Sequence, residues 1–252
     1  MIFAITNAKG GIGKTTAAIN LAAGLAEKSR RTLLIDLDPQ GHASRCFANM
    51  DLERDVSDLI MDKPSQAYRS VMTTKYPHLD MVPTTNELIE TSELLSSRIR
   101  REERLQRALE PLREEYRYII IDCPPSLGIL TYNAINAADL LIIPIQPGVG
   151  AVIGVAALLE AAQELRDEEE VPYRILINMF DVRTTRTNSI IEELLDDYRQ
   201  RVFKTIISKS EALNQANIAG ETIWKANRNS RSAGEFDALC EEILKLRIRS
   251  RI

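Results

Sequence analysis

The fold is decided by the stretch IFAITNAKGGIGKTT, residues 2–16, in which an apolar run passes into a glycine-rich loop and then into a helical pattern. The pattern G-x-x-x-x-G-K-[ST] in such a place binds phosphate, because backbone N–H groups and the start of the helix surround the anion. Here the first glycine is replaced by Ala8, and the lysine of the pattern is Lys14. The loop holds one lysine more than the pattern requires, Lys9. The stretch therefore predicts a nucleotide site with an additional cation.

The chemistry expected of the loop follows from its residue types. Its glycines let the backbone approach a phosphate without a side-chain clash. Lys14 is expected to reach the β- and γ-phosphates, and the hydroxyl of Thr15 to bind Mg²⁺. The nucleotide-binding residues predicted here are Gly10, Gly11, Ile12, Gly13, Lys14, Thr15 and Thr16.

Short apolar runs alternate with helical patterns along the whole chain. Mostly unalternated apolar runs suit strands that are buried on both faces of a parallel sheet. The alternation predicts an α/β fold, a single domain over residues 1–252 with a doubly wound, mostly parallel sheet flanked by helices. The expected strands are 2–6, 32–36, 79–83, 118–122, 140–145, 174–178 and 202–207, and the expected helices are 15–28, 86–115, 149–167, 186–200 and 234–246.

Aspartates follow two of the expected strands. LLIDLDPQG ends its strand on Asp36 and carries Asp38 two residues later, and YIIIDCPPS ends its strand on Asp122. Ligands bind beyond the carboxyl ends of strands in an open α/β sheet, so we expect these acids beside the phosphate loop. Asp122 is expected to support Mg²⁺ together with Thr15, with the carboxylate acting through water. Asp38 is expected to orient or deprotonate an attacking water close to the same ion.

The composition is that of a globular protein, with 44% hydrophobic and 27% charged residues. No uninterrupted apolar run reaches the ~18 residues of a membrane span, and no secretory leader pattern opens the sequence. Cys46, Cys123 and Cys240 form neither a C-x-x-C metal pair nor a disulfide framework. We therefore expect a cytoplasmic protein.

Charge is distributed unevenly, although the net charge is only −4. Residues 199–252 contain eleven Lys/Arg against six Asp/Glu, which makes this part +5 and leaves −9 for residues 1–198. Such asymmetry favours a surface that faces a polyanion, and an ordinary solvated surface is the alternative.

Four segments together closely resemble the ParA-type partition ATPases, relatives of MinD and of the nitrogenase iron proteins. The segments are KGGIGKTT, DLDPQGHAS, IIIDCPPSLGILTYNAI and NMFDVRT, and the resemblance runs to about residue 235. It implies an ATPase that uses ATP and Mg²⁺ and forms a homodimer with ATP. Lys14 would serve its own nucleotide, while Lys9 would cross to the ATP of the other subunit. Asp38 would be the hydrolytic acid, Asp122 the Walker B acid, and Asn178 an adenine contact.

The resemblance also implies a cellular role. Family members bind nucleoid DNA without sequence preference in their ATP state and partition or position a plasmid, chromosome region or protein assembly. Hydrolysis is slow until a cargo-bound partner, ParB-like or an adaptor, stimulates it. Where relatives often carry proline and a DNA-contacting arginine, this chain has Ser208 and Ala212. Other basic residues are therefore the candidate DNA contacts: Arg183, Lys204, Lys209, Arg228 and Arg231.

Two alternatives share the ATP chemistry. A MinD-like ATPase would bind membrane through the tail EEILKLRIRSRI, but apolar and basic residues alternate there at period two, so a helix would mix its faces. Membrane binding is therefore not the favoured prediction. A small-molecule ligase of related fold is the other alternative, whereas an iron–sulfur reductase would need a cysteine set that the chain lacks.

Overall fold

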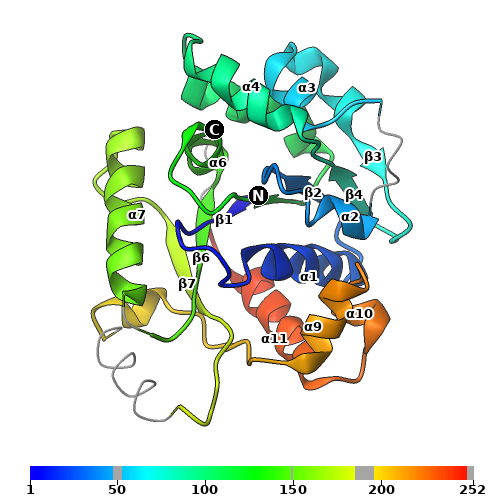
Figure 1. Cartoon of the computed structure of the whole chain (residues 1–252), viewed down its shortest axis with the longest axis vertical. Coiled ribbons are helices and arrows are strands. Elements are labelled where there is room, and N and C mark those ends of the chain that lie inside the picture. The colour runs from blue at the N-terminus through cyan, green and yellow to red at the C-terminus, as the bar shows by residue number, and fades with distance from the viewer. Residues whose placement is uncertain (48–52, 149, 185–195, 249–252) are drawn as a thin grey trace.

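A seven-stranded sheet forms the centre of the computed structural model, which describes residues 1–47, 53–148, 150–184 and 196–248 (Figure 1). The strand order is β3-β4-β2-β5-β1-β6-β7, and all neighbours are parallel except β3 and β4. The expected fold class, a doubly wound and mostly parallel α/β sheet, is confirmed. The strands are β1 (Ile2–Ile5), β2 (Thr32–Asp36), β3 (Met72–Thr73), β4 (Leu79–Val82), β5 (Tyr118–Asp122), β6 (Leu140–Ile145) and β7 (Tyr173–Ile177).

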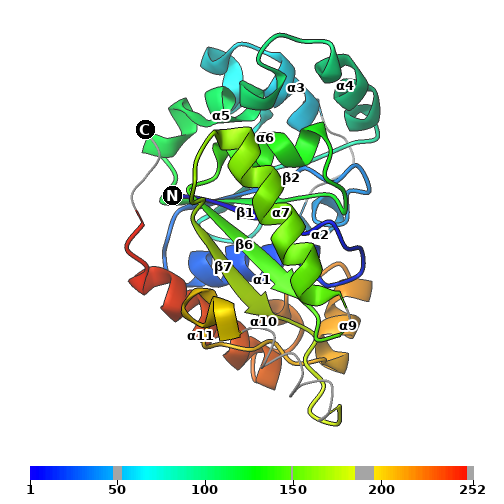
Figure 2. The same ribbon diagram turned by 90° about the vertical axis from the view of Figure 1, so that its left-hand side faces the viewer.

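Helices cover both faces of the sheet, as the two views in Figures 1 and 2 show. Successive residues of β1 alternate between two cores: Ile2 and Ala4 pack in one, Phe3 and Ile5 in the other. The first core includes residues of α3–α7, and the second includes residues of α1, α9, α10 and α11. The α-helices are α1 (Lys14–Glu27), α2 (Ser44–Phe47), α3 (Val56–Met61), α4 (Glu87–Ser96), α5 (Arg104–Leu109), α6 (Ile129–Ala137), α7 (Ala151–Arg166), α9 (Glu211–Ile218), α10 (Ile223–Ala226) and α11 (Arg231–Lys245), and the 3₁₀ turns are η1 (Pro64–Ser70), η2 (Arg101–Glu103), η3 (Pro111–Glu114) and η4 (Asp196–Arg201).

The expected strand at 202–207 is wrong. The segment makes isolated parallel bridges to the sheet edge, at Val202 with Ile175 and at Ser208 with Phe180. Between these bridges the carboxylate of Glu242 on α11 accepts the backbone N–H groups of residues 204 and 205, at 2.9 and 2.6 Å. A side chain therefore takes the place of a strand partner in the middle of the run.

The single helix expected over 86–115 is also wrong, because the chain forms α4, α5 and two 3₁₀ turns there. Arg100 lies in the left-handed region with φ 54°, which breaks the helical path. Helical structure resumes in α5, where the side chain of Asn133 accepts the backbone N–H of Leu105 at 3.0 Å. Of the helix expected at 186–200, residues 186–195 lie outside the described residues, and η4 begins at Asp196.

The sheet order brings the ends of β2, β5 and β1 together. Asp36 and Asp122 are direct neighbours across β2 and β5, and Ile5 is the neighbour of Asp122 on β1. The loops that follow these three strands therefore meet at one edge of the sheet. In the described part of the chain, no helix has both the length and the apolar character needed to cross a bilayer.

Candidate functional site

The glycine-rich loop between β1 and α1 is held by a side chain from the end of β7. Nδ2 of Asn178 donates a hydrogen bond to the carbonyl of Ile12 at 2.7 Å. Gly11 and Gly13 have φ of 72° and 82°, which side chains rarely adopt. A Cβ atom at Gly13 would lie 2.6 Å from Nδ2 of Asn178, so this contact also requires glycine there. The structure thus places Asn178 at the loop, where its predicted adenine contact stays a prediction.

The start of α1 is open to a ligand. Gly13 occupies the N-cap position, and none of the described side chains caps the first turn. Uncapped N–H groups at a helix start, together with the helix dipole, attract an anion. Lys14 is 6% exposed, and its Nζ donates to the carbonyl of Lys9 at 2.8 Å. Burial lowers the pKa of Lys14, an effect that the charge of Asp122 partly offsets.

Asp122 is a buried acid without hydrogen-bond support. Its side chain is 0% exposed, and neither carboxyl oxygen accepts a hydrogen bond of normal geometry from the described residues. Burial raises the pKa of Asp122 well above its usual value, and the charge of Asp36 adds to the rise. The nearby Thr15 hydroxyl acts in the opposite direction. A divalent cation beside Thr15 would supply the positive charge that this carboxylate lacks, so the residues present fit Mg²⁺.

Asp36 has a different role, although it ends β2 just as Asp122 ends the neighbouring strand β5. Its Oδ2 accepts hydrogen bonds from the backbone N–H and the hydroxyl of Ser44, both at 2.7 Å. Its Oδ1 accepts the backbone N–H of Asp38 at 3.2 Å. Burial raises the pKa of Asp36 to about 6, although these hydrogen bonds lower it. Asp36 therefore fixes the loop that carries Asp38.

A cavity of about 640 Å³ lies at the start of α1, and we call it the nucleotide cavity. The phosphate loop and Asp38 form one part of its lining. The opposite wall comes from α2 and from Asn217–Gly220, at the end of α9. Sequence reasoning missed this second wall, because no motif marks it and only the packing of distant segments creates it. Lys9 is exposed and is not part of the lining.

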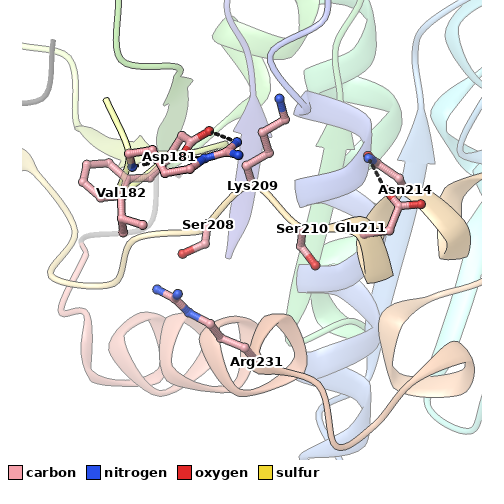
Figure 3. Close-up of a pocket in the computed structure, with 10 residues that line it drawn as sticks. Asp181, Val182, Ser208, Lys209, Ser210, Glu211, Asn214 and Arg231 are labelled. Atoms are coloured by element: carbon pink, nitrogen blue, oxygen red, sulfur yellow. Dashed lines mark hydrogen bonds and ion pairs between the residues drawn. The ribbon is translucent and has the colours of Figure 1, made fainter. Parts of the chain in front are cut away.

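Three of the five candidate DNA contacts surround a second cavity of about 360 Å³, which we call the basic pocket (Figure 3). Arg183 forms an ion pair with Asp181 at 2.6 Å, and Arg231 one with Glu235 at 2.8 Å. Lys209 is exposed and makes no ion pair with the described residues. The other two candidates, Lys204 and Arg228, do not line this pocket, and Arg228 pairs with Glu27 on α1. The pocket lining is Phe180, Asp181, Val182, Arg183, Ser208, Lys209, Ser210, Glu211, Asn214 and Arg231.

Sequence comparison finds relatives over nearly the full chain. The family model AAA_31, described as an AAA domain, matches residues 1–175. The sporulation initiation inhibitor protein Soj of Bacillus subtilis is 38% identical over 247 residues, covering 96% of this chain and 97% of Soj. The chromosome partitioning protein ParA of Myxococcus xanthus is 37% identical over 253 residues, covering 97% of this chain and 88% of that protein.

Solved structures match with similar coverage. A plasmid partition protein from Borrelia burgdorferi bound to AMPPNP has a TM-score of 0.81 and 26% identity, covering 97% of this chain and 98% of that one. Cobyrinic acid a,c-diamide synthase from Mycobacterium smegmatis, with bound ATP analogue and magnesium, has a TM-score of 0.78 and 27% identity, covering 97% and 94%.

Proposed function

The chain belongs to the AAA_31 family and, within it, to the ParA-type ATPases, and from this we propose that it is an ATP-switched dimer that partitions or positions a cargo on nucleoid DNA. It is an ATPase, and its cofactors are ATP and Mg²⁺. The observation that carries the proposal is the nucleotide cavity, which is lined by an uncapped helix start, the buried Lys14 and Asp38, with the buried carboxylate of Asp122 behind Thr15.

Each part of the cavity has a task in hydrolysis. The N–H groups at the start of α1 and the ammonium of Lys14 bind the phosphates and hold them in place. Thr15 and Asp122 would hold Mg²⁺, Asp122 through water, and the ion would neutralise charge at the phosphate oxygens. Asp38 orients the attacking water, and its position is fixed by the hydrogen bond from its N–H to Asp36. Residues 1–252 form one ATPase domain, and its more basic part, residues 199–252, faces DNA.

The exposed Lys9 supports ATP-dependent dimerisation. Its backbone N–H donates to Oδ1 of Asn7 at 3.0 Å, and Nδ2 of Asn7 donates to the carbonyl of Pro144 at 2.9 Å. These two hydrogen bonds anchor the backbone of the loop at Lys9, while the Lys9 side chain faces outward. Nearby, the first turn of α7 carries Ile153, a large apolar side chain that is 75% exposed. A cation and an apolar helix face at the rim of a nucleotide cavity suit a second copy of the chain, because a polyphosphate attracts the cation most strongly where water is excluded.

The basic pocket supports binding to DNA phosphates. Lys209 makes no ion pair with the described residues, and Ser208 and Ser210 line the same pocket. Lys209 and Arg231 extend in different directions in Figure 3, so they are expected to contact different phosphates. Contacts to phosphate carry no sequence information, which suits a protein that coats the nucleoid. A cargo-bound, ParB-like or adaptor protein would then stimulate hydrolysis and release the dimer.

Substitution of Lys9 tests the dimer. Lys9→Ala should remain monomeric with ATP in sedimentation velocity while keeping much of its ATP affinity, because Lys14 still serves the nucleotide of its own subunit. Lys63→Ala is the matched control, since Lys63 is also exposed and makes no ion pair with the described residues. It should dimerise like the unmodified protein. A full ATP dimer in Lys9→Ala would refute the role of Lys9 across the interface.

A second candidate function is small-molecule ligation, which is favoured by the similarity to cobyrinic acid a,c-diamide synthase. Turnover separates the two candidates. A positioning ATPase must keep its ATP state until its activator arrives, so the purified protein should hydrolyse ATP slowly. Rapid hydrolysis that requires a small organic acid and an amine donor, with no effect of DNA, would favour the ligase.

A further inference from the structure

One helix, α9, connects the two cavities. Residues Asn217–Gly220 at its C-terminal end line the nucleotide cavity. Ser210, Glu211 and Asn214 at its other end line the basic pocket. Ser210 caps the helix by accepting the N–H of Leu213, so the start of α9 is a defined structure. The two sites that the proposed function needs are therefore at opposite ends of one rigid element.

The C-terminal end of α9 makes a specific contact with the phosphate-binding helix. Nδ2 of Asn217 donates a hydrogen bond to Oγ1 of Thr16 at 3.0 Å. A threonine hydroxyl has one hydrogen to donate and an oxygen that accepts. Since Oγ1 accepts from Asn217, its own hydrogen is available for another acceptor. Thr16 lines the nucleotide cavity two residues after Lys14, where the acceptors expected are phosphate oxygens.

The next helix, α10, is bonded to the backbone and side chain of Asn20 on α1. Oδ1 of Asn20 accepts the N–H of Ile223 at 2.8 Å, and the Asn20 carbonyl accepts Nε1 of Trp224 at 3.1 Å. Nδ2 of Asn20 donates to the Thr16 carbonyl at 2.9 Å. Asn20 is 1% exposed, so these bonds are shielded from water and are expensive to break. Hydrogen bonds thus join α9 and α10 to Thr16 through its side chain and, by way of Asn20, through its carbonyl.

We propose that Asn217 is a positioning residue: by donating to Thr16 it makes that hydroxyl a donor to the nucleotide, and it links nucleotide occupancy to the start of α9 in the basic pocket. The link to the basic pocket rests on the proposed function, whereas the effect on nucleotide affinity does not. Coupling of this kind is reciprocal, so a ligand that favours one position of α9 at either end raises affinity at the other.

Two substitutions of Asn217 test the direction of the hydrogen bond. Asn217→Ala removes one hydrogen bond and should weaken ATP binding about 3- to 10-fold. Asn217→Asp should weaken it more, because a carboxylate accepts the Thr16 hydrogen and withdraws it from the phosphates. In both variants the effect should fall on KM and leave kcat within about twofold, since Lys14, Asp38 and Asp122 are unchanged. Gln215→Ala, on the same helix but in neither cavity, is the matched control and should have no effect.

Hydrogen exchange tests the link along α9 without DNA. In a Lys9→Ala background, which isolates the monomer, a non-hydrolysable ATP analogue should slow exchange of the Leu213 amide. Asn217→Ala at saturating analogue should abolish this protection, and Gln215→Ala should retain it. ATP affinity in Asn217→Asp equal to that of the unmodified protein, or unaltered protection in Asn217→Ala, would overturn the inference. Neither result would bear on DNA binding, whose failure would appear only in a DNA titration of the unmodified protein.

Discussion

Two buried aspartates illustrate how a site residue differs from a structural one at the scale of a single side chain. Asp139 accepts the N–H of Ile2 at 2.7 Å and pairs with Arg113 at 3.1 Å. Asp122 is equally buried but has no hydrogen bond of normal geometry from the described residues. A buried charge without partners destabilises a fold, and such a cost is expected of a carboxylate whose predicted task is to support a cation.

We therefore expect Asp122→Asn to raise the free energy of unfolding of the nucleotide-free protein by about 1–3 kcal/mol while abolishing protection by Mg-ATP. The pKa of Asp122 is raised by burial, so the folded state holds its proton more tightly than the unfolded state, and the penalty grows as pH rises above the unfolded pKa. The gain should consequently be larger at pH 8 than at pH 5 in urea unfolding. Asp139→Asn, the control, should lower stability by about 3 kcal/mol. A less stable Asp122→Asn at both pH values would contradict this account.

The sequence predicted where Lys14 and Asp122 lie, whereas their roles stay predictions. Lys14 begins the helix after β1 and Asp122 ends β5, so the pairing of β1 with β5 is enough to bring them to one edge of the sheet. Sequence reasoning assigned the hydrolytic role to Asp38 but no role to Asp36, because the hydrogen bonds of Asp36 to Ser44 appear only when the loop folds back. The wall at Asn217–Gly220 comes from a segment about 200 residues along the chain from Thr16, which no local pattern marks.

At the scale of elements, the phosphate-binding helix α1 packs against α10 and α11 at a glycine. A methyl group at Gly24 would lie 2.6 Å from Sγ of Cys240 and 2.9 Å from Cζ2 of Trp224. At Gly234, on the exposed side of α11, it would meet nothing within 4 Å. Gly24→Ala should therefore lower the free energy of unfolding by about 1–3 kcal/mol through overpacking, against the gain in helix propensity. Gly234→Ala should raise it by about 0.5–1 kcal/mol. Urea unfolding at pH 7 measures both, and a Gly24→Ala variant as stable as Gly234→Ala would show that the helices can separate freely.

The sequence predicted elements well where burial on both faces is complete. All residues of β1, β2, β5 and β6 are buried, and their runs are correspondingly apolar. The run at 202–207 has the same character, but the side chain of Glu242 takes its central N–H groups. The break at Arg100 is followed by hydrogen bonds of the Asn133 side chain to the backbone of Arg101 and Leu105, a tertiary contact that no local pattern marks.

At the scale of the whole molecule, positive charge collects in residues 199–252, and an ATP-bound dimer would carry this part twice. Two linked weak contacts bind far more tightly than one, so DNA binding should require ATP and fall steeply with salt. Lys209→Ala should reduce the slope of log affinity against log salt by about 1 per subunit, with similar effect on any duplex sequence. Fluorescence anisotropy of labelled duplexes measures this, and Lys63→Ala is again the control. Binding to anionic liposomes but not to duplex DNA at low salt would favour the MinD-like alternative instead.

The tryptophan that packs on α1 gives the molecule an optical reporter. Trp224 is the only tryptophan in the sequence, it is half-buried on α10, and its indole N–H is bonded to the carbonyl of Asn20. Indole emission depends on the polarity around the ring, so its wavelength follows the contact between α10 and the helix that begins at the phosphate loop. Intrinsic fluorescence can therefore record both nucleotide binding and unfolding in the unlabelled protein, and stopped-flow mixing can time one against the other.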